Sequence, residues 1–301
     1  MHKAIRSWLF VPADSERKLA RAAGLDGESA ADALILDLED ALSPARKAHG
    51  RAMAVDFLKT AKPQSQIWIR INPLDSPLCA ADLEAVIPHA PAGIVLPKPD
   101  GPVDVEALST RIGALERRHG LAAGKIRIMA VATETARAVT SLGLYPRTYL
   151  PRLCALSWGA EDLATDLGAT TNKGADGRFA FVYQMVRAQM LIAAKASEVQ
   201  AVETLYDNFR DPDGLKTRAQ RAFCEGFNGM LAIHPAQVPI INARFTPDPA
   251  QIAHARAVIA AFAAKPGAGA VELEGKMLDR PHLKQAQNIL ALYDKQSETR
   301  D

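Results

Sequence analysis

The chain has 301 residues and a formal net charge of +2, which is too small to indicate binding to nucleic acid or to an anionic membrane surface. Hydrophobic residues make up 48% of the sequence and aromatic residues only 6%, a composition typical of an Ala- and Leu-rich α/β protein with a sizeable core. The first residues show no signal-peptide pattern, and no apolar run approaches the length of about 18 residues that a membrane span needs. The three cysteines, Cys79, Cys154 and Cys224, are widely spaced and odd in number, so we expect reduced thiols in a cytoplasmic protein.

Short apolar runs alternate with Ala-rich helical stretches along the chain. The runs indicate buried parallel strands because they are short and alternate little between apolar and polar residues. Several of the stretches between them begin with Pro or Asp, as helices prefer, and helices are predicted at 44–59, 103–119, 179–197, 213–225 and 249–265. Eight such units predict an α/β fold, the (β/α)₈ TIM barrel. The eight runs cover residues 7–13, 33–40, 67–73, 93–99, 126–134, 153–162, 199–206 and 229–237.

The predicted barrel is followed by a short tail. No break in composition separates a second domain within residues 1–265, so we predict that these residues form one catalytic barrel domain. The sequence KPGAGA at residues 265–270 is a flexible connection to residues 266–301, which end in an amphipathic helical pattern. We expect this C-terminal helical extension to pack on a barrel mouth or on a neighbouring subunit.

Polar residues stand at the end of every predicted strand. In a (β/α)₈ barrel the carboxyl ends of the strands face one mouth, where active sites of this fold are built. The alternative explanation is that strand ends carry polar residues simply because they meet solvent. The strand-end residues are Asp14, Ser15, Asp37, Glu39, Asp40, Arg70, Asn72, Lys98, Glu134, Glu161, Asp162, Glu203, Asp207 and His234.

Glu134 and Asp162 follow consecutive predicted strands, and the segment between them has room for one helix and its turns. Two carboxylates at the same end of neighbouring parallel strands are hard oxygen ligands for Mg²⁺, which leaves most of its coordination positions to water and substrate. The sequence therefore predicts a Mg²⁺ site. The alternative is that Glu134 caps the following helix and Asp162 caps a short turn.

A family resemblance is carried by eight segments, namely RSWLFVPADSERKLARA, LILDLEDALSPARKA, IWIRINP, IVLPKP, VATETARAV, SWGAEDLATDLG, LAIHPAQV and GKMLDRP. With these segments the chain resembles the citrate lyase β-subunit-like family of the HpcH/HpaI aldolase superfamily. The resemblance runs in order from Arg6 to Leu292. It implies a barrel fold, Mg²⁺ as cofactor, a trimeric homo-oligomer and the activity of a carbon–carbon lyase on a coenzyme A thioester.

This resemblance implies roles for individual residues. It assigns the metal to Glu134 and Asp162, with Glu134 also against the substrate. Arg70 matches the substrate arginine of the family, and its fork of donors suits a carboxylate or a developing enolate. The alternative for Arg70 is a buried ion pair with Glu39 or Asp40.

Glu39 and Asp40 are expected to support Arg70 or to bind metal-bound water. Asp37 shares a strand face with Glu39, and which of these three carboxylates enters the mouth stays open. Lys98 matches a family lysine, and we expect it to form ion pairs, with Glu134 or Asp40 as partners, rather than a Schiff base.

The coenzyme A contacts are expected near the first helix and the eighth strand. Arg17, Lys18 and Arg21 follow the first strand, so they and the helix start suit a pyrophosphate, although a solvated charged face explains the same pattern. His234 matches a family IHP motif near the coenzyme A path or the barrel lip, and a structural histidine is the alternative. Glu203 stands where the family more often has Asp.

Asp279 matches a family aspartate that reaches a neighbouring subunit's active site, where it would handle the enolate proton; the alternative is a helix N-cap next to Pro281. Together these residues predict a Mg²⁺-dependent lyase that cleaves a 3-hydroxyacyl-CoA, such as malyl-CoA or citramalyl-CoA, to acetyl-CoA and a 2-oxo acid, or that forms it. The alternatives are a malyl-CoA thioesterase, a 2-oxo-acid aldolase that needs no coenzyme A, and a citryl lyase β subunit that depends on an acyl carrier protein. The identity of the oxo acid is decided by loop side chains and is not predicted.

Overall fold

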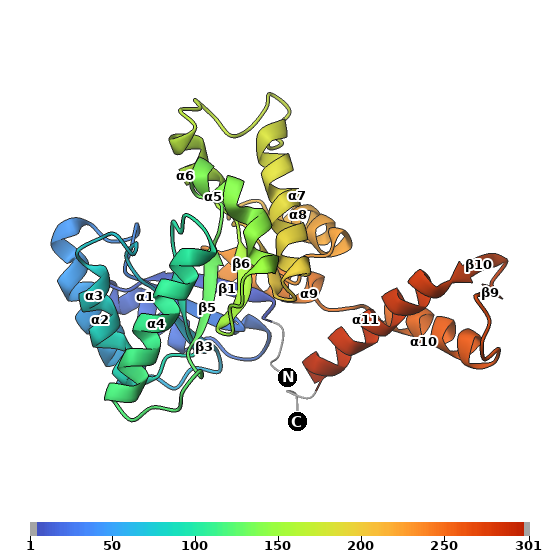
Figure 1. The fold of residues 1–301 in the computed structure, drawn as a ribbon, viewed down its shortest axis with the longest axis horizontal. Coiled ribbons are helices and arrows are strands. Elements are labelled where there is room, and N and C mark those ends of the chain that lie inside the picture. The colour runs from blue at the N-terminus through green and yellow to red at the C-terminus, as the bar shows by residue number, and fades with distance from the viewer. Residues whose placement is uncertain (1–4, 298–301) are drawn as a thin grey trace. The chain divides into compact units, whose positions relative to one another are not determined.

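The computed structural model describes residues 5–297, and eight parallel strands within this range close into a barrel surrounded by helices (Figure 1). Each strand pairs with the next one along the chain, and the eighth pairs with the first. This arrangement confirms the predicted (β/α)₈ barrel. The strands are β1 (Ser7–Pro12), β2 (Ala33–Asp37), β3 (Gln66–Arg70), β4 (Gly93–Leu96), β5 (Arg127–Val131), β6 (Leu153–Ser157), β7 (Gln200–Glu203) and β8 (Gly229–Ala232).

All eight predicted strands are present, but the strands end earlier than the apolar patterns suggested. The pattern over 33–40 ends as a strand at Asp37, so Glu39 and Asp40 lie in the following loop. In the same way Glu134 follows the end of β5, and Asp162 lies within a helix. Several polar residues of the mouth, Glu39, Asp40, Glu134 and Asp162, therefore lie in loops or helices beyond the strand ends.

The helices of the barrel begin where the sequence provides caps. Asp211, for example, accepts a hydrogen bond from the backbone N–H of Gly214, and Pro212 occupies the first turn of the helix that follows. The α-helices are α1 (Glu16–Ala23), α2 (Lys47–Thr60), α3 (Cys79–Val86), α4 (Pro102–Arg118), α5 (Ala136–Ser141), α6 (Ala160–Asp166), α7 (Phe181–Ala196), α8 (Pro212–Glu225) and α9 (Val238–Arg244). Short 3₁₀ helices are η1 (Gly27–Ser29), η2 (Pro44–Arg46), η3 (Ile87–His89), η4 (Leu142–Arg147) and η5 (Pro235–Gln237).

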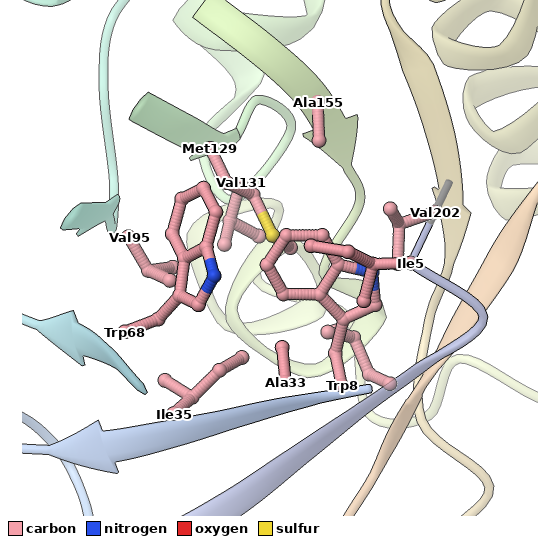
Figure 2. Packing of buried hydrophobic residues seen from close by; sticks show 11 residues of the cluster. Ile5, Trp8, Ala33, Ile35, Trp68, Val95, Met129, Val131, Ala155 and Val202 are labelled. Carbon is pink, nitrogen blue, oxygen red and sulfur yellow. The ribbon is translucent and has the colours of Figure 1, made fainter. Parts of the chain in front are cut away.

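The interior of the barrel is filled by large apolar side chains (Figure 2). Trp8 and Trp68 are fully buried and meet edge to face, with ring centroids 4.8 Å apart. Gly93 on β4 makes room for this pair, because a Cβ atom there would lie 2.1 Å from the Trp68 ring. Burying side chains of this size contributes about 1.5–3 kcal/mol each to stability.

The inward face of the strands changes from apolar to polar toward the mouth. Ile35 and Trp68 belong to the apolar interior, and Asp37 and Arg70 follow them by two residues on the same faces of β2 and β3. The paired strands place Asp37 directly opposite Arg70. A polar layer therefore stands on the apolar core.

Residues 5–242 form one compact unit, and the C-terminal residues 243–297 form a second one. It contains α10 (Pro249–Ala263), a hairpin of β9 (Ala270–Leu273) and β10 (Lys276–Asp279), and α11 (Arg280–Ser297). Thus α10, which we had placed in the barrel domain, groups with the tail, because it shares an apolar cluster with the hairpin and α11. The tail helix was predicted, but the hairpin was not, because its two-residue turn with positive φ at Glu274 and Gly275 lacks the usual Asn-Gly or Asp-Gly sequence. Whether the tail packs on a mouth or on a neighbouring subunit stays a prediction.

Within residues 5–297, no helix is both long enough and apolar enough to span a membrane.

Candidate active site

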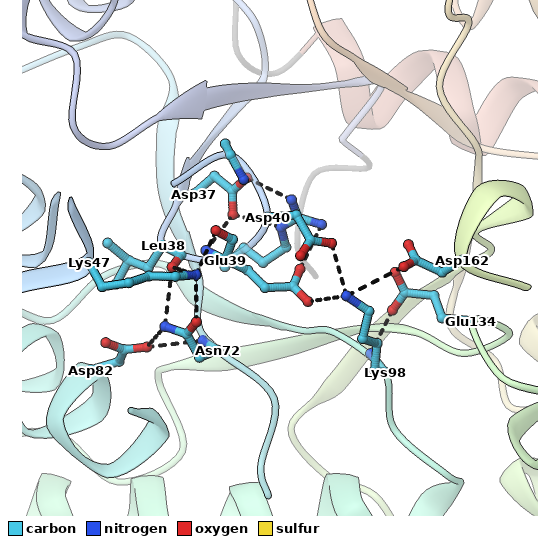
Figure 3. Close-up of polar contacts among 12 residues, drawn as sticks. Asp37, Leu38, Glu39, Asp40, Lys47, Asn72, Asp82, Lys98, Glu134 and Asp162 are labelled. Carbon is cyan, nitrogen blue, oxygen red and sulfur yellow. Dashed lines mark hydrogen bonds and ion pairs between the residues drawn. The ribbon is translucent and has the colours of Figure 1, made fainter. Parts of the chain in front are cut away.

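The loop after β2 is held from two sides. The Asp37 carboxylate accepts hydrogen bonds from the backbone N–H groups of Glu39 and Ala41 at 2.9 and 3.2 Å, so it closes the turn. Lys47 of α2 donates to the carbonyl oxygens of Leu38 and Glu39 at 2.9 and 2.7 Å. These hydrogen bonds fix the turn, and the Glu39 and Asp40 carboxylates lie on the side of the loop opposite Lys47 (Figure 3).

Lys47 is itself part of a chain of hydrogen bonds. It donates to Asn72 Oδ1 at 2.8 Å, and Asn72 Nδ2 donates to Asp82 Oδ2 at 2.6 Å (Figure 3). Asp82 is 1% exposed and also pairs with Arg51. Lys47 and Asp82 were missed from the sequence, where nothing distinguishes them from ordinary helix residues.

Arg70 lies at the end of β3 and is committed to two carboxylates. Its Nε and Nη2 atoms donate to the two oxygens of Asp37 at 2.7 and 2.6 Å, and its Nη1 lies 3.0 Å from Glu39 Oε2. Its guanidinium also stands over the Phe10 ring, 4.7 Å from the centroid. Although burial opposes the charge, the hydrogen bonds and ion pair with Asp37 raise the pKa of Arg70 above its ordinary value. The expected ion pair with Glu39 is present, and Asp37, rather than Asp40, is the second partner.

Lys98 follows β4 and makes contacts on both sides of the mouth. Its Nζ lies 2.6 Å from Glu39 Oε1, 2.9 Å from Asp40 Oδ2 and 3.4 Å from Asp162 Oδ1 (Figure 3). Burial works against the ammonium, but the hydrogen bonds to Glu39 and Asp40 prevail and raise the pKa of Lys98 above its ordinary value. A Schiff base needs the neutral amine, so this setting favours the ion-pair role.

Glu134 is a buried carboxylate beside a glycine. It is 3% exposed, and its Oε2 accepts a hydrogen bond of 2.6 Å from the backbone N–H of Lys98. Gly159 allows this approach, since a Cβ atom there would lie 2.9 Å from Glu134 Cγ. Burial, followed by the charge of Glu39, raises the pKa of Glu134 to about 8. A cation beside this carboxylate would relieve both effects.

Capping does not explain either predicted metal ligand. The N-cap of α5 is Thr135, whose hydroxyl accepts from the backbone N–H of Ala138, and the N-cap of α6 is Gly159. Glu134 therefore precedes the cap, and Asp162 lies within the first turn of α6 with its side chain 38% exposed. The two alternatives based on helix caps were wrong.

The donor set of the mouth fits a hard divalent cation. Five carboxylates, those of Asp37, Glu39, Asp40, Glu134 and Asp162, face only two cationic side chains, Arg70 and Lys98. Within the part of the chain that the structure describes, no three His, Cys, Asp or Glu side chains form a ready-made metal cage. The carboxylates of Glu134 and Asp162 alone supply too few oxygens to fill an octahedron, and the excess of negative charge around them matches the way Mg²⁺ is held together with water and substrate.

The predicted coenzyme A contacts near the first strand lie on the solvent-facing side of α1. Arg17, Lys18 and Arg21 are exposed on α1, while its buried side is formed by Leu19 and Ala22. This placement agrees with a solvated charged face, and it leaves the side chains accessible to a phosphate.

His234 has a defined local role. Its Nδ1 accepts a hydrogen bond of 3.1 Å from the backbone N–H of Ala236, which caps η5, and its ring stacks on Phe209 with centroids 5.0 Å apart. The structural alternative for His234 is therefore observed, and its place near coenzyme A stays a prediction.

Glu203 does not serve the open mouth, contrary to what its strand-end position suggested. It is 0% exposed and accepts hydrogen bonds from Trp158 Nε1 at 2.7 Å, Arg187 Nε at 2.6 Å and Arg218 Nη2 at 3.3 Å. Since Trp158 directly precedes Gly159, this buried cluster anchors the start of α6, which carries Asp162. The sequence gives no signal for this role, because the three donors come from the β6–α6 loop and two later helices.

Asp279 belongs to the other compact unit. It is the last residue of β10, its side chain is 49% exposed, and its Oδ1 lies 2.5 Å from His282 Nδ1. Its predicted role toward a second copy of the chain stays a prediction.

The barrel and the charged, mostly acidic side chains at its mouth define an enzyme of the (β/α)₈ class. A family model described as HpcH/HpaI aldolase/citrate lyase matches residues 6–235. The chain is 33% identical over 310 residues to the mitochondrial citramalyl-CoA lyase of Rattus norvegicus, covering 97% of this chain and 87% of that protein. It is 34% identical over 289 residues to a (3S)-malyl-CoA thioesterase of Cereibacter sphaeroides, covering 95% of this chain and 93% of that protein.

A solved structure shows the same fold. Protein CitE from Mycobacterium tuberculosis, in complex with magnesium, acetoacetate and coenzyme A, superimposes with a TM-score of 0.79 and 31% identity, covering 97% of this chain and 98% of that one. The chain therefore belongs to the HpcH/HpaI aldolase/citrate lyase family, and it is an enzyme of the carbon–carbon lyase class.

Proposed function

We propose that this enzyme is a Mg²⁺-dependent lyase that cleaves a 3-hydroxyacyl-CoA, such as malyl-CoA or citramalyl-CoA, to acetyl-CoA and a 2-oxo acid, or that catalyses the reverse condensation. The observation that carries the proposal is the convergence of Glu134, Asp162 and Arg70 on one acidic mouth through their contacts with Lys98 and Glu39. The named relatives and the CitE complex with magnesium and coenzyme A support it.

The cleavage has three chemical steps that the protein must support. The 3-hydroxyl group loses a proton, the bond between C2 and C3 breaks, and its electron pair becomes the thioester enolate while the oxo acid leaves. The enolate carbon then takes up a proton to give acetyl-CoA. Glu134 and Asp162 would hold Mg²⁺, which when bound supplies a Lewis acid and a template for the oxygens of the oxo acid.

The remaining steps fall to side chains of the mouth and the tail. Arg70 stays charged because of Asp37, so its donors can stabilise a carboxylate or the enolate. Glu39 holds both Arg70 and Lys98 in place. Asp279 of a second copy would exchange the proton with the enolate carbon, which makes an oligomer, and in this family a trimer, part of the proposal.

The proposed coenzyme A contacts are Arg17, Lys18 and Arg21 for phosphate groups and His234 for the lip of the path. The substitutions Arg17→Gln and Arg21→Gln are expected to raise KM for the acyl-CoA with little change in kcat. The cytoplasmic location stays a prediction, and one relative is described as mitochondrial.

The test is acetyl-CoA release from malyl-CoA, citramalyl-CoA and citryl-CoA, measured with Mg²⁺ and again with EDTA. Release that needs the metal and is confined to one of these esters would support the lyase and identify its substrate. Absence of release from all three would reject the proposal in this form.

A thioesterase is the second candidate, because one relative is named a (3S)-malyl-CoA thioesterase. The same assay separates the two: a thioesterase gives free coenzyme A and malate from malyl-CoA, whereas a lyase gives acetyl-CoA and glyoxylate. Turnover of a free hydroxy acid with no affinity for coenzyme A esters would favour an aldolase, and activity only with an acyl carrier protein would favour a citryl lyase subunit.

A further inference from the structure

Lys98 contacts both proposed metal ligands, and it does so through different groups. Its backbone N–H donates to Glu134 Oε2 at 2.6 Å, and its ammonium lies 3.4 Å from Asp162 Oδ1. Figure 3 shows the side chain extending between Glu134 and Asp162 on one side and the β2 loop on the other. Lys98 is thus the link between the metal ligands and the carboxylates Glu39 and Asp40.

The backbone of Lys98 is unusual. Its φ is 47°, in the left-handed region that disfavours residues other than glycine, and the following Pro99 restricts it further. The other non-glycine residues with positive φ between residues 5 and 297 are Ala90, Glu198 and Glu274, which lie in turns next to or between strands. At Lys98 the strained conformation aims the N–H group at a buried carboxylate, and such strain at a functional site points to a role.

The ammonium is placed where it would meet a bound cation. It is closest to Glu39 and Asp40, at 2.6 and 2.9 Å, and more distant from Asp162, at 3.4 Å. A divalent cation on Asp162 brings like charge next to the ammonium, and Asp162 is the weakest of its three partners. The contact with Asp162 is therefore the one that a metal would displace.

We propose that the Lys98 ammonium, as an ion-pair partner of Asp162, competes with Mg²⁺ for this carboxylate and so sets the affinity of the site for the metal. The inference rests on the proposed metal ligands Glu134 and Asp162. When Mg²⁺ binds, the ammonium gives up Asp162 and remains on Glu39 and Asp40. Lys98 is then a positioning residue with two separable roles. Its backbone orients Glu134, and its side chain sets the affinity of the site for Mg²⁺.

The experiment is calorimetric titration of the full-length protein with MgCl₂, with the thermal midpoint of the metal-free protein as a second readout. Lys98→Met removes the ammonium and keeps the strained φ. Lys98→Gly also removes the ammonium, but it adopts this φ freely. The matched control is Lys216→Met, which removes an exposed ammonium whose partner, Asp213 of α8 at 2.9 Å, is not one of the five mouth carboxylates.

We expect both Lys98 variants to bind Mg²⁺ about tenfold more tightly than the wild type, and Lys216→Met to bind within about twofold of it. The metal-free midpoint should fall in Lys98→Met because the carboxylates lose their counter-ion, and it should fall less in Lys98→Gly because the strain is relieved. If Lys98 had only a structural role, its replacement would lower the thermal midpoint without increasing the affinity for Mg²⁺.

Two results would overturn the inference while the metal site stands. One is a wild type that binds Mg²⁺ together with Lys98 variants that bind no tighter. The other is a clear difference in Mg²⁺ affinity between Lys98→Met and Lys98→Gly, since the backbone would then set the affinity. If the wild type itself shows no binding at millimolar MgCl₂, the proposed metal site fails and this inference fails with it.

Discussion

The substitution Glu203→Gln tests whether the buried ion cluster of Glu203, Arg187 and Arg218 keeps the start of α6, and with it Asp162, in position. The change keeps the size of the side chain and its ability to accept from Trp158, but it removes the charge that faces Arg187 and Arg218. Both arginines are largely buried, with side chains 10% and 20% exposed. Arg187 retains Glu225 as a partner, so its charge does not lose all compensation.

The expected loss follows from this geometry. Removing one member of a buried charge pair costs about 3–5 kcal/mol, and the remaining Glu225 contact places this variant near the lower end, at about 3 kcal/mol. For a unit of the size of the barrel, residues 5–242, that corresponds to a midpoint lowered by roughly 6–12 °C. The assay is thermal unfolding followed by circular dichroism, with tryptophan fluorescence reporting the environment of Trp158. Because Trp158 leads into the turn that carries Asp162, we also expect weaker Mg²⁺ binding.

The control is Glu84→Gln, which removes a carboxylate paired with Arg118 where both side chains are about half exposed. Exposed pairs contribute about 0–1 kcal/mol, so this midpoint should hardly move. If Glu203→Gln lowers the midpoint no more than Glu84→Gln does, the assignment of Glu203 as the anchor of α6 is refuted.

Three further predictions concern the mouth itself. Glu134→Gln and Asp162→Asn should each abolish Mg²⁺ binding and lower acetyl-CoA release by about a hundredfold or more, with an unchanged circular dichroism spectrum; a metal-independent, active double variant would contradict this. The affinity for Mg²⁺ should fall as the pH drops below about 8, by up to about tenfold per pH unit, because the metal must displace the proton that the raised pKa of about 8 keeps on Glu134. Calorimetric titrations between pH 6 and 9 measure this, and an affinity independent of pH would disprove it. Lys47→Met should cost about 1–3 kcal/mol of stability and lower kcat, because the loop that carries Glu39 loses its hydrogen bonds to the ammonium. Lys59→Met, at an exposed position of the same helix, is the control, and equal effects of the two changes would argue against a role in holding the loop.

The eight strands and the two proposed metal ligands were accessible from the sequence. A buried parallel strand leaves a local signal, a short apolar run, and the carboxyl ends of such strands meet at one mouth. The sequence therefore predicts Glu134 and Asp162 at one mouth, although the predicted strands extend beyond the ends of β5 and β6. The tail hairpin escaped prediction because its turn at Glu274 carries no recognised turn sequence.

The partners of the mouth residues could be predicted only in part. Arg70 was expected to meet Glu39 or Asp40, and it meets Asp37 and Glu39, because the parallel register sets Asp37 opposite Arg70. Glu203 was read as a mouth residue, and it is buried under Arg187 and Trp158 instead.

The sequence by itself determined the barrel, its strands and the residues from which a metal site can be built, because each of these depends on local patterning and on strand-end position. Only the tertiary structure decided which charges pair. Lys98 reaches Glu39 across 59 positions of the chain, and its left-handed backbone carries no mark in the residue type. Ion pairs and strained dihedrals depend on closure of the barrel, which brings side-chain atoms from distant strand ends to within about 3 Å of one another, and local sequence does not encode that geometry.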